Sequence, residues 1–239
     1  MTGPDRHRFF ADSIAEDVVA LPAEEAHHAL HVLRLTDGTA LEVFDGMGGV
    51  GEGVLRVPDR RGASVEIRLR RSARPVAAPV VELGFAVPKG KRLDWLLEKA
   101  TELGAGVLAP VVFARSVARP DLSGKARARW RAHCIAAAKQ CRADLLPEIR
   151  PPEELTDFLA RPLAGVFGDP AAGHSLATAL AELAGAQRVR ILVGPEGGMT
   201  DPERAAAEAA GLTPVRLGGY VLRTETAAVA MLAAVRAGG

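Results

Sequence analysis

Residues 191–203 have the sequence ILVGPEGGMTDPE, and residues 217–227 have the sequence LGGYVLRTETA. Each segment begins as an apolar strand, passes through a turn that contains glycine, and continues into a helix. In the first segment, Thr200, Pro202 and Glu203 have the spacing of a capping box at a helix start. Because ligands of open α/β sheets bind beyond the carboxyl ends of the strands, we expect both turns at a ligand site.

The chemistry of these turns excludes a nucleotide P-loop. The first turn lacks Gly-Lys-Ser/Thr, and the carboxylate of Glu196 would repel a triphosphate, whereas it could attract a ligand with a sulfonium charge. Two neighbouring turns of this kind expose backbone N–H and C=O groups that can bind an adenine between apolar side chains. For either turn alone, a turn that merely needs glycine flexibility is the better interpretation.

From residue 80 onward, apolar strands alternate with amphipathic helices, which predicts an α/β domain with a mainly parallel sheet. Strands are expected at residues 80–87, 107–112, 164–167, 189–193 and 214–217. Helices are expected at residues 93–103, 125–143, 201–210 and 224–237. The last helix is almost wholly small and apolar, so we expect it to be buried, either in the core or against a second subunit.

The N-terminal part of the chain has a different pattern. Short apolar runs and turn signals predict a small β-barrel with one helix at residues 23–35 and strands at 17–21, 40–45, 53–57 and 64–69. A Pro/Ala-rich run at residues 72–79 fits an extended connector. We therefore expect two domains, residues 1–72 and 73–239.

Residues 46–51 match the dinucleotide-binding pattern G-x-G-x-x-G. Such a loop binds phosphate because a helix starts directly after it. Here residues 53–57 follow, and they have the composition of a strand. The glycines therefore predict a hairpin loop.

The composition of the 239 residues, with 48% hydrophobic and 25% charged, is that of a soluble globular protein. No apolar run approaches the roughly 20 residues that cross a bilayer, and the N-terminus lacks the apolar segment of a signal peptide, so we expect a cytoplasmic protein. Cys134 and Cys141 are seven residues apart on a predicted helix, too far for a disulfide, and no cluster of zinc ligands surrounds them.

The net charge of +1 hides an uneven distribution. Residues 73–150 contain 14 Lys and Arg against 7 Asp and Glu, whereas the flanking segments contain 9 against 12 and 7 against 10. A local basic surface suits a polyanion such as RNA, because phosphate contacts are local. A solvated basic helix would explain the same composition equally well.

The motifs together resemble one family. GPEGG at residues 194–198, followed by LGxxxLRTETA from residue 217, is similar to the cofactor signature of RsmE-type ribosomal RNA uracil-N3 methyltransferases of the SPOUT superfamily. Other family elements occur in the same order along nearly the whole chain: Arg8-Phe9-Phe10, His28 to Arg34, residues 88–104, Arg115-Ser116-Val117, and Trp130 with residues 137–142 and Pro147.

The resemblance implies a PUA-like RNA-binding β-barrel at residues 1–72 and a SPOUT domain with a trefoil knot at residues 73–239. It also implies a homodimer that uses S-adenosylmethionine, without a metal, to methylate N3 of a uridine in 16S ribosomal RNA of the small ribosomal subunit. Two alternatives stay open. One is a SPOUT enzyme that acts on tRNA or a ribose 2′-hydroxyl, and the other is a non-catalytic RNA-binding assembly factor.

Uracil N3 is a poor nucleophile until its proton leaves, and an arginine is suited to stabilise the resulting negative charge. Arg223 is our candidate, with a salt bridge at the helix start as its structural alternative. Glu225 or Glu196 could act as base or orient Arg223, but could also cap a helix or hold a ribose hydroxyl. We place Arg223 and Glu225 in the catalytic group.

The resemblance assigns cofactor binding to residues of both turns: Leu192, Val193, Gly194, Pro195, Glu196, Gly197, Gly198, Leu217, Gly218, Val221, Leu222, Arg223, Thr224 and Thr226. The candidates for RNA contact are basic residues along the chain: His28, Arg34, Lys89, Arg115, Arg127, Arg129, Arg131, Lys139 and Arg142. For His28, a structural role is an equally good interpretation.

Overall fold

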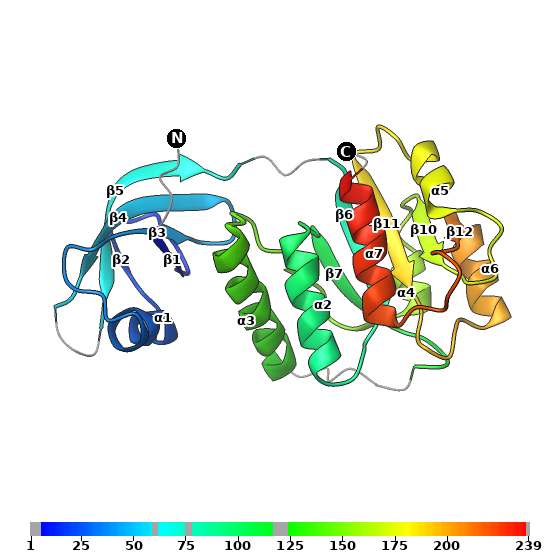
Figure 1. Cartoon of the computed structure of the whole chain (residues 1–239), viewed down its shortest axis with the longest axis horizontal. Helices are drawn as coiled ribbons and strands as arrows, with labels where there is room; N and C mark the ends of the chain where they lie inside the picture. Colours follow the sequence, from blue (N-terminus) through cyan, green and yellow to red (C-terminus); the bar gives the residue numbers. More distant parts are fainter. Residues whose placement is uncertain (1–5, 59–61, 75–77, 117–123, 238–239) are drawn as a thin grey trace. The chain divides into compact units, whose positions relative to one another are not determined.

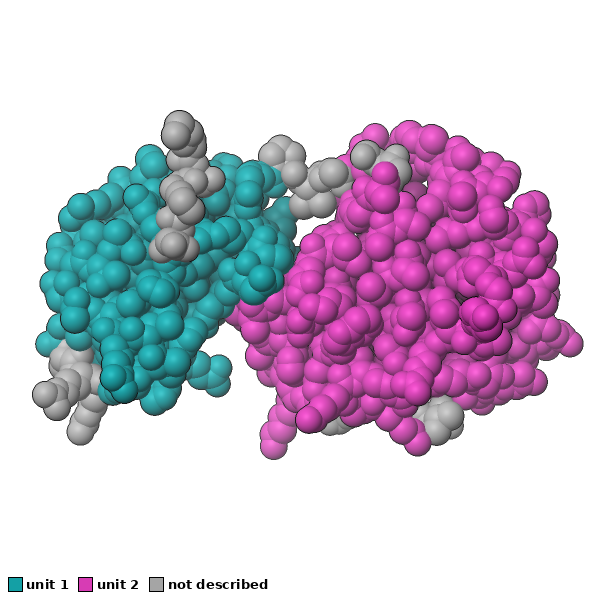
Figure 2. Space-filling model, in the orientation of Figure 1, with its two compact units in different colours: residues 1–75, 138–146 teal, residues 76–137, 147–239 magenta. Residues whose placement is uncertain are grey.

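A computed structural model of the chain describes residues 6–58, 62–74, 78–116 and 124–237. The chain divides into two compact units, drawn in teal and magenta in Figure 2. The first unit comprises residues 1–75 and 138–146, and the second comprises residues 76–137 and 147–239. These units are defined by compactness, so the domain boundary expected between residues 72 and 73 stays a prediction. The structure adds that residues 138–146, which the sequence assigned to the second domain, pack with the first unit.

The first unit contains one five-stranded sheet within the described residues, in the order β1-β3-β4-β5-β2 (Figure 1). β1 pairs with β3 in parallel, and the other pairs are antiparallel. The hairpin predicted around the glycine-rich segment is confirmed, because β3 and β4 are antiparallel neighbours in sequence. The strands are β1 (His7–Phe10), β2 (Val18–Ala20), β3 (Ala40–Phe44), β4 (Gly49–Arg56) and β5 (Ser64–Ser72).

The helix predicted near residue 23 is confirmed, but it is shorter than expected. α1 (Ala23–His27) continues into a π-helical turn, η1 (His28–Val32). The helical conformation stops before Arg34, whose φ of 54° lies in the left-handed region. Ala26 and Ala29 are buried in the same apolar core as the strand residues, so small side chains let this helix approach the sheet closely.

The glycine-rich turn between β3 and β4 has a packing role. Leu146 N donates a hydrogen bond to Gly46 O at 2.9 Å, and Met47 forms a β-bridge with Leu145. A Cβ atom on Gly46 would lie 2.5 Å from Leu146 Cδ1, and Gly46 has a φ of 72°. Glycine is therefore needed here for the close approach of residues 138–146 and not for a nucleotide.

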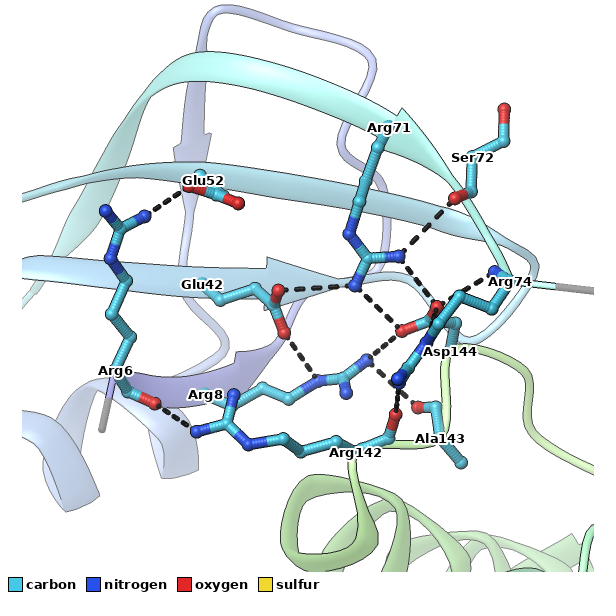
Figure 3. Close-up of polar contacts among 10 residues, drawn as sticks. All are labelled: Arg6, Arg8, Glu42, Glu52, Arg71, Ser72, Arg74, Arg142, Ala143 and Asp144. Atoms are coloured by element: carbon cyan, nitrogen blue, oxygen red, sulfur yellow. Dashed lines mark hydrogen bonds and ion pairs between the residues drawn. The ribbon is translucent and has the colours of Figure 1, made fainter. Parts of the chain in front are cut away.

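A buried ionic cluster holds the same segment (Figure 3). Asp144, whose side chain is 2% exposed, accepts hydrogen bonds from Arg8 Nη2 at 2.9 Å, Arg71 Nη1 at 2.7 Å and Arg74 N at 3.0 Å. Glu42 Oε1 lies 3.2 Å from Arg8 Nε, and Glu42 Oε2 accepts a hydrogen bond from Arg71. Burial alone would raise the pKa of Asp144, but these hydrogen bonds outweigh it and hold the pKa well below its ordinary value.

The second unit contains a seven-stranded sheet, counted over the described residues, with the order β12-β10-β11-β6-β7-β8 and with β9 also paired to β7. All of these pairs are parallel, as predicted. β8 and β9 were not expected, because two-residue strands have no detectable periodicity. The strands are β6 (Val80–Ala86), β7 (Val107–Val112), β8 (Glu148–Ile149), β9 (Glu153–Glu154), β10 (Gly165–Gly168), β11 (Arg188–Val193) and β12 (Leu212–Val215).

Helices cover this sheet (Figure 1). α7 packs on α2, β6 and β11, and α4 packs on α6 and β7. The expected burial of the last helix is confirmed within the unit, whereas its contact with a second subunit stays a prediction. These helices are α2 (Lys91–Glu102), α4 (Leu155–Leu159), α5 (Leu176–Glu182), α6 (Asp201–Ala209) and α7 (Thr224–Ala237). A further helix, α3 (Gly124–Cys141), belongs to the second unit up to residue 137 and to the first unit from residue 138.

Among the described helices, α3 is the longest, and it contains both cysteines. Cys134 and Cys141 are free thiols, as predicted. Burial raises the pKa of the Cys134 thiol. Among the described residues, no helix combines the length and the apolar character that a membrane span requires.

An ion pair is buried within the second sheet. Arg190 on β11 is 0% exposed, and its Nη2 lies 3.0 Å from Glu82 Oε1 on β6. Arg150 Nη1 reaches the same oxygen at 3.0 Å, and the Phe158 ring centroid lies 4.3 Å from the Arg190 guanidinium carbon. Burial, which disfavours the charged form, lowers the pKa of Arg190. The apolar pattern of residues 189–193 did not indicate this pair.

Candidate functional site

The parallel neighbours β10, β11 and β12 end at one edge of the second sheet, where their following loops enclose a cavity of about 370 Å³. Its lining comes from the last residue of each of these strands and from the loop that follows it: residues 168–170, 193–196 with 198 and 199, and 215–222. Arg204 of α6 and Thr224 and Ala227 of α7 complete the wall. This is the strand-end position at which α/β sheets bind ligands, as predicted for two of the three loops.

A confirmed capping box fixes the loop that follows β11. Thr200 Oγ1 accepts from Glu203 N, and Glu203 Oε2 accepts from Thr200 N at 2.7 Å. Ala114 N donates to Glu203 Oε1 at 2.7 Å. Burial alone would raise the pKa of Glu203, but the hydrogen bonds from Ala114 and Thr200 outweigh it and lower the pKa.

Glycine backbone shapes the cavity at two positions. Gly198 and Gly218 line it with φ values of 73° and 68°, in the region that side chains other than glycine disfavour. Gly198 N donates to Pro195 O at 2.8 Å. Thr224 Oγ1 donates to Gly194 O at 3.0 Å and so joins the loop after β11 to the start of α7.

Both signs of charge occur around the cavity. Glu196 Oε1 lies 3.0 Å from Arg92 Nη1 of α2. Asp169 lies at the end of β10, with its Oδ2 3.9 Å from Arg204 Nε, and Arg216 lines the cavity as well. The cavity therefore offers carboxylates to a cationic group and guanidinium groups to an anionic one.

The structure brings most of the predicted cofactor residues to this cavity. Those that line it are Val193, Gly194, Pro195, Glu196, Gly198, Leu217, Gly218, Val221, Leu222 and Thr224. Leu192 instead lies in the buried apolar core, and Gly197, Arg223 and Thr226 are not part of the lining. Asp169, Arg204 and Tyr220 line the cavity although the sequence did not assign them. The strand-end rule, applied to the strand predicted at residues 164–167, would have found Asp169.

The two candidate catalytic residues have different surroundings. Arg223 is exposed, and no described residue accepts a hydrogen bond from its guanidinium or pairs with it, so the salt bridge considered as its structural role is not seen there. Glu225 is 6% exposed, and its Oε2 has no hydrogen-bond partner among the described residues. Glu225 lines a second hollow, with Thr226 of α7 and with Lys91, Arg92 and Trp95 of α2.

Two of the basic candidates for RNA contact are engaged inside the first unit. Lys139 Nζ lies 2.8 Å from both carboxylate oxygens of Glu25. Arg142 Nη2 donates to Arg6 O at 3.2 Å, and Arg142 O accepts from Arg74. Both side chains therefore make contacts within the first unit that explain their presence without an RNA phosphate.

The two N-terminal candidates, His28 in η1 and Arg34 just after it, differ from each other. His28 packs edge-on against Phe9 with ring centroids 6.1 Å apart, and burial, followed by the charge of Lys139, lowers its pKa. This supports the structural interpretation of His28. Arg34 is exposed.

The second unit contains the other basic candidates. Lys89, Arg127 and Arg131 are exposed. Arg115 Nη1 donates to Gly197 O at 3.0 Å, and Arg129 Nη2 donates to Asp94 at 2.7 and 3.0 Å. Val117 of the predicted Arg-Ser-Val element lies outside the described residues.

Comparison with known families matches both parts of the chain. An RNA methyltransferase domain family matches residues 76–236, and an RNA methyltransferase PUA domain family matches residues 21–68. The expected combination of an N-terminal PUA-like domain and a C-terminal parallel-sheet domain is confirmed. The trefoil knot stays a prediction.

Ribosomal RNA small subunit methyltransferase E of Mycobacterium tuberculosis is 35% identical over 242 residues, which cover 95% of this chain and 90% of that protein. A putative methyltransferase from Legionella pneumophila, solved with bound SAM, superposes with a TM-score of 0.90 at 26% identity over 98% of both chains. The Neisseria gonorrhoeae ribosomal RNA small subunit methyltransferase E, bound to S-adenosyl methionine, superposes with a TM-score of 0.86 at 28% identity over 98% of both chains.

Proposed function

Because the chain belongs to the RNA methyltransferase family that includes ribosomal RNA small subunit methyltransferase E, we propose that it methylates N3 of a specific uridine in 16S ribosomal RNA with S-adenosylmethionine as methyl donor. The observation that supports this most is the cavity at the ends of β10, β11 and β12. The two sequence motifs that resemble the family's cofactor signature both line this cavity, which lies at the strand ends of the parallel sheet. Two glycines with positive φ, Gly198 and Gly218, also line it.

The cavity fits the chemistry of S-adenosylmethionine. About 370 Å³ is within the range of small-molecule sites, and apolar side chains such as Val193 and Leu222 adjoin exposed glycine backbone, which suits an adenine. Glu196 and Asp169 suit the cationic sulfonium and amino groups, and Arg204 and Arg216 suit the carboxylate. When bound, this cofactor supplies an already electrophilic methyl group, so the chemistry requires no metal.

The protein must then help to remove the proton from uracil N3. Removing it leaves negative charge on the flanking carbonyl oxygens, which a forked arginine stabilises well. Arg223 is exposed and unpaired among the described residues, one position before α7, so its guanidinium is available to a substrate. Glu225, on the first turn of α7, is the candidate base for this proton.

The proposal also covers the oligomeric state, the form of the RNA substrate and the location in the cell. The resemblance implies a homodimer, action on RNA of the small ribosomal subunit, and a cytoplasmic location. Sedimentation velocity tests the dimer, and methylation assays with free 16S RNA and with isolated small subunits test which substrate is used.

The decisive experiment is mass-spectrometric mapping of methylated nucleosides in ribosomal RNA from a deletion strain, with and without the purified chain. Loss and restoration of one N3-methyluridine in 16S RNA is the expected result. A lost 2′-O-methyl group or a lost tRNA methylation would support the alternative enzyme. A chain that binds no S-adenosylmethionine in calorimetry would support the non-catalytic assembly factor.

Arg223→Lys tests the catalytic assignment. Lysine keeps the charge but loses the planar fork, so the single-turnover rate should fall on the order of 10²-fold, with the melting temperature nearly unchanged. A near-wild-type rate at saturating cofactor and RNA would remove Arg223 from the catalytic step.

A further inference from the structure

The peptide unit between Gly197 and Gly198 lies at the wall of the cavity proposed for the cofactor. Gly198 lines this cavity with a φ of 73°. Because neither of the two residues has a Cβ atom, the backbone bonds on both sides of this peptide rotate with little steric hindrance. A rotation of the peptide would change the shape of the cavity wall, so the contacts of its two polar groups decide that shape.

Both polar groups of this peptide have a partner. Gly198 N donates to Pro195 O at 2.8 Å, which closes a tight turn within the loop after β11. On the other side, Gly197 O accepts a hydrogen bond from Arg115 Nη1 at 3.0 Å. The first contact is local, whereas the second comes from a residue 82 positions away in the sequence. Arg115 therefore holds the peptide from outside its own loop.

Arg115 belongs to the loop that follows β7. In the strand order of the sheet, β6 lies between β7 and β11, so the contact joins loops that follow two non-adjacent strands. The side chain also packs on its target: a Cβ atom on Gly197 would lie 3.4 Å from Arg115 Cβ and 3.7 Å from Arg115 Cδ. The aliphatic part of Arg115 thus covers Gly197, while the guanidinium binds its carbonyl oxygen.

The backbone around Arg115 is itself fixed. Phe113 N donates to Ser116 Oγ at 2.9 Å, and Ser116 N donates to Phe113 O at 3.0 Å, so this segment closes into a turn. Ala114 N donates to Glu203 Oε1 at 2.7 Å, which ties the turn to the capping box of α6. The side chain of Arg115 therefore starts from a backbone position that two sets of contacts define.

We propose that Arg115 is a positioning residue for the cofactor, an inference that rests on the function proposed above. Its guanidinium holds the carbonyl group of Gly197 and so keeps Gly198 in the conformation that shapes the cavity. The sequence makes Arg115 a candidate for RNA contact, whereas its position in the fold connects it with the cofactor loop. Arg115 acts through this loop, because it is not among the described residues that line the cavity.

The test measures the affinity of the full chain for S-adenosylhomocysteine by calorimetry. Arg115→Ala should raise the Kd about tenfold, since it removes a hydrogen bond from a charged donor and the side chain that covers Gly197. Arg115→Lys should recover part of this loss, because an ammonium group can still donate to a carbonyl oxygen. The matched control is Arg188→Ala, which removes the same charge from an exposed position at the opposite end of β11 and should bind normally.

Hydrogen exchange of the Gly198 amide in the cofactor-free chain reports on the peptide itself. This N–H is bonded to Pro195 O, so its exchange should become faster in Arg115→Ala and stay unchanged in Arg188→Ala. The melting temperature should change little in either variant, because both arginines are exposed. At saturating cofactor and RNA, Arg115→Ala should methylate at close to the wild-type rate, so that the loss appears in the KM for S-adenosylmethionine and not in kcat.

Four results would overturn the positioning role. The first two are an unchanged Kd for S-adenosylhomocysteine in Arg115→Ala, and a raised Kd with an unchanged exchange rate of the Gly198 amide. Weaker RNA binding with a lower salt slope and unaltered cofactor affinity would instead make Arg115 a phosphate contact. A lower melting temperature with normal affinity of the folded chain would make it a purely structural residue. If cofactor affinity depends on Arg115 but the wild type forms no N3-methyluridine, the positioning role stands and the proposed function fails.

Discussion

Replacement of Asp144 by Asn should destabilise the first unit strongly. Asp144 is 2% exposed and accepts hydrogen bonds from Arg8, Arg71 and Arg74 N, and Asn has a single acceptor oxygen and an N–H₂ group that would face these donors. Removing one partner of a buried ion pair costs about 3–5 kcal/mol. Because Glu42 still pairs with Arg8, we expect about 3 kcal/mol, or a melting temperature lower by about 6–12 °C for a chain of this size.

Urea denaturation followed by circular dichroism measures this loss, and hydrogen exchange of residues 138–146 localises it. The matched control is Asp17→Asn, since Asp17 pairs with Arg70 at 3.0 Å but is 89% exposed. A surface pair of this kind contributes about 0–1 kcal/mol. If Asp144→Asn is no less stable than Asp17→Asn at pH 7, the cluster does not hold the segment.

The same variant has a defined pH dependence. The folded-state pKa of Asp144 is lowered, so its contribution is fully present above the unfolded pKa of about 4 and is lost as the pH falls toward the folded value. The stability difference between wild type and Asp144→Asn should therefore shrink from pH 5 downward. A difference that stays constant to pH 3 would contradict the assigned cause.

Three further predictions concern Gly198, two exposed basic residues and the buried Glu82–Arg190 pair. Gly198→Val should abolish S-adenosylmethionine binding in calorimetry, because valine disfavours a φ of 73°. The control Gly173→Val places its side chain in open space and should bind normally; if both variants bind with equal affinity, the loop after β11 is not part of the cofactor site. Lys89→Glu with Arg127→Glu should lower the slope of RNA affinity against salt by about one per lost phosphate contact, and an unaltered slope would assign both to a solvated surface. Glu82→Gln should cost about 3–5 kcal/mol in urea denaturation, because it leaves a fully buried arginine unpaired; a loss under about 1 kcal/mol would be inconsistent with this.

Much of the second unit follows from local pattern. The parallel strands, the helix at residues 224–237 and the capping box of Thr200 and Glu203 were predicted, because each depends on residues within a few positions of one another. The strand-end rule then placed two of the three loops that line the cavity. In the first unit, β1 was missed, because its four residues, HRFF, show no alternation of apolar and polar side chains.

The sequence by itself determined the two-part architecture, the family and two of the loops that line the cavity, since periodicity, turn residues and motif order are local properties. Only the tertiary structure decided which charges are available. Lys139 and Arg142 are equally basic in sequence, but distant residues of the first unit accept their hydrogen bonds. The hollow lined by Trp95 and Glu225 could not be predicted from the sequence either. It lies between the starts of two helices that are more than a hundred residues apart, and no local pattern indicates such a contact.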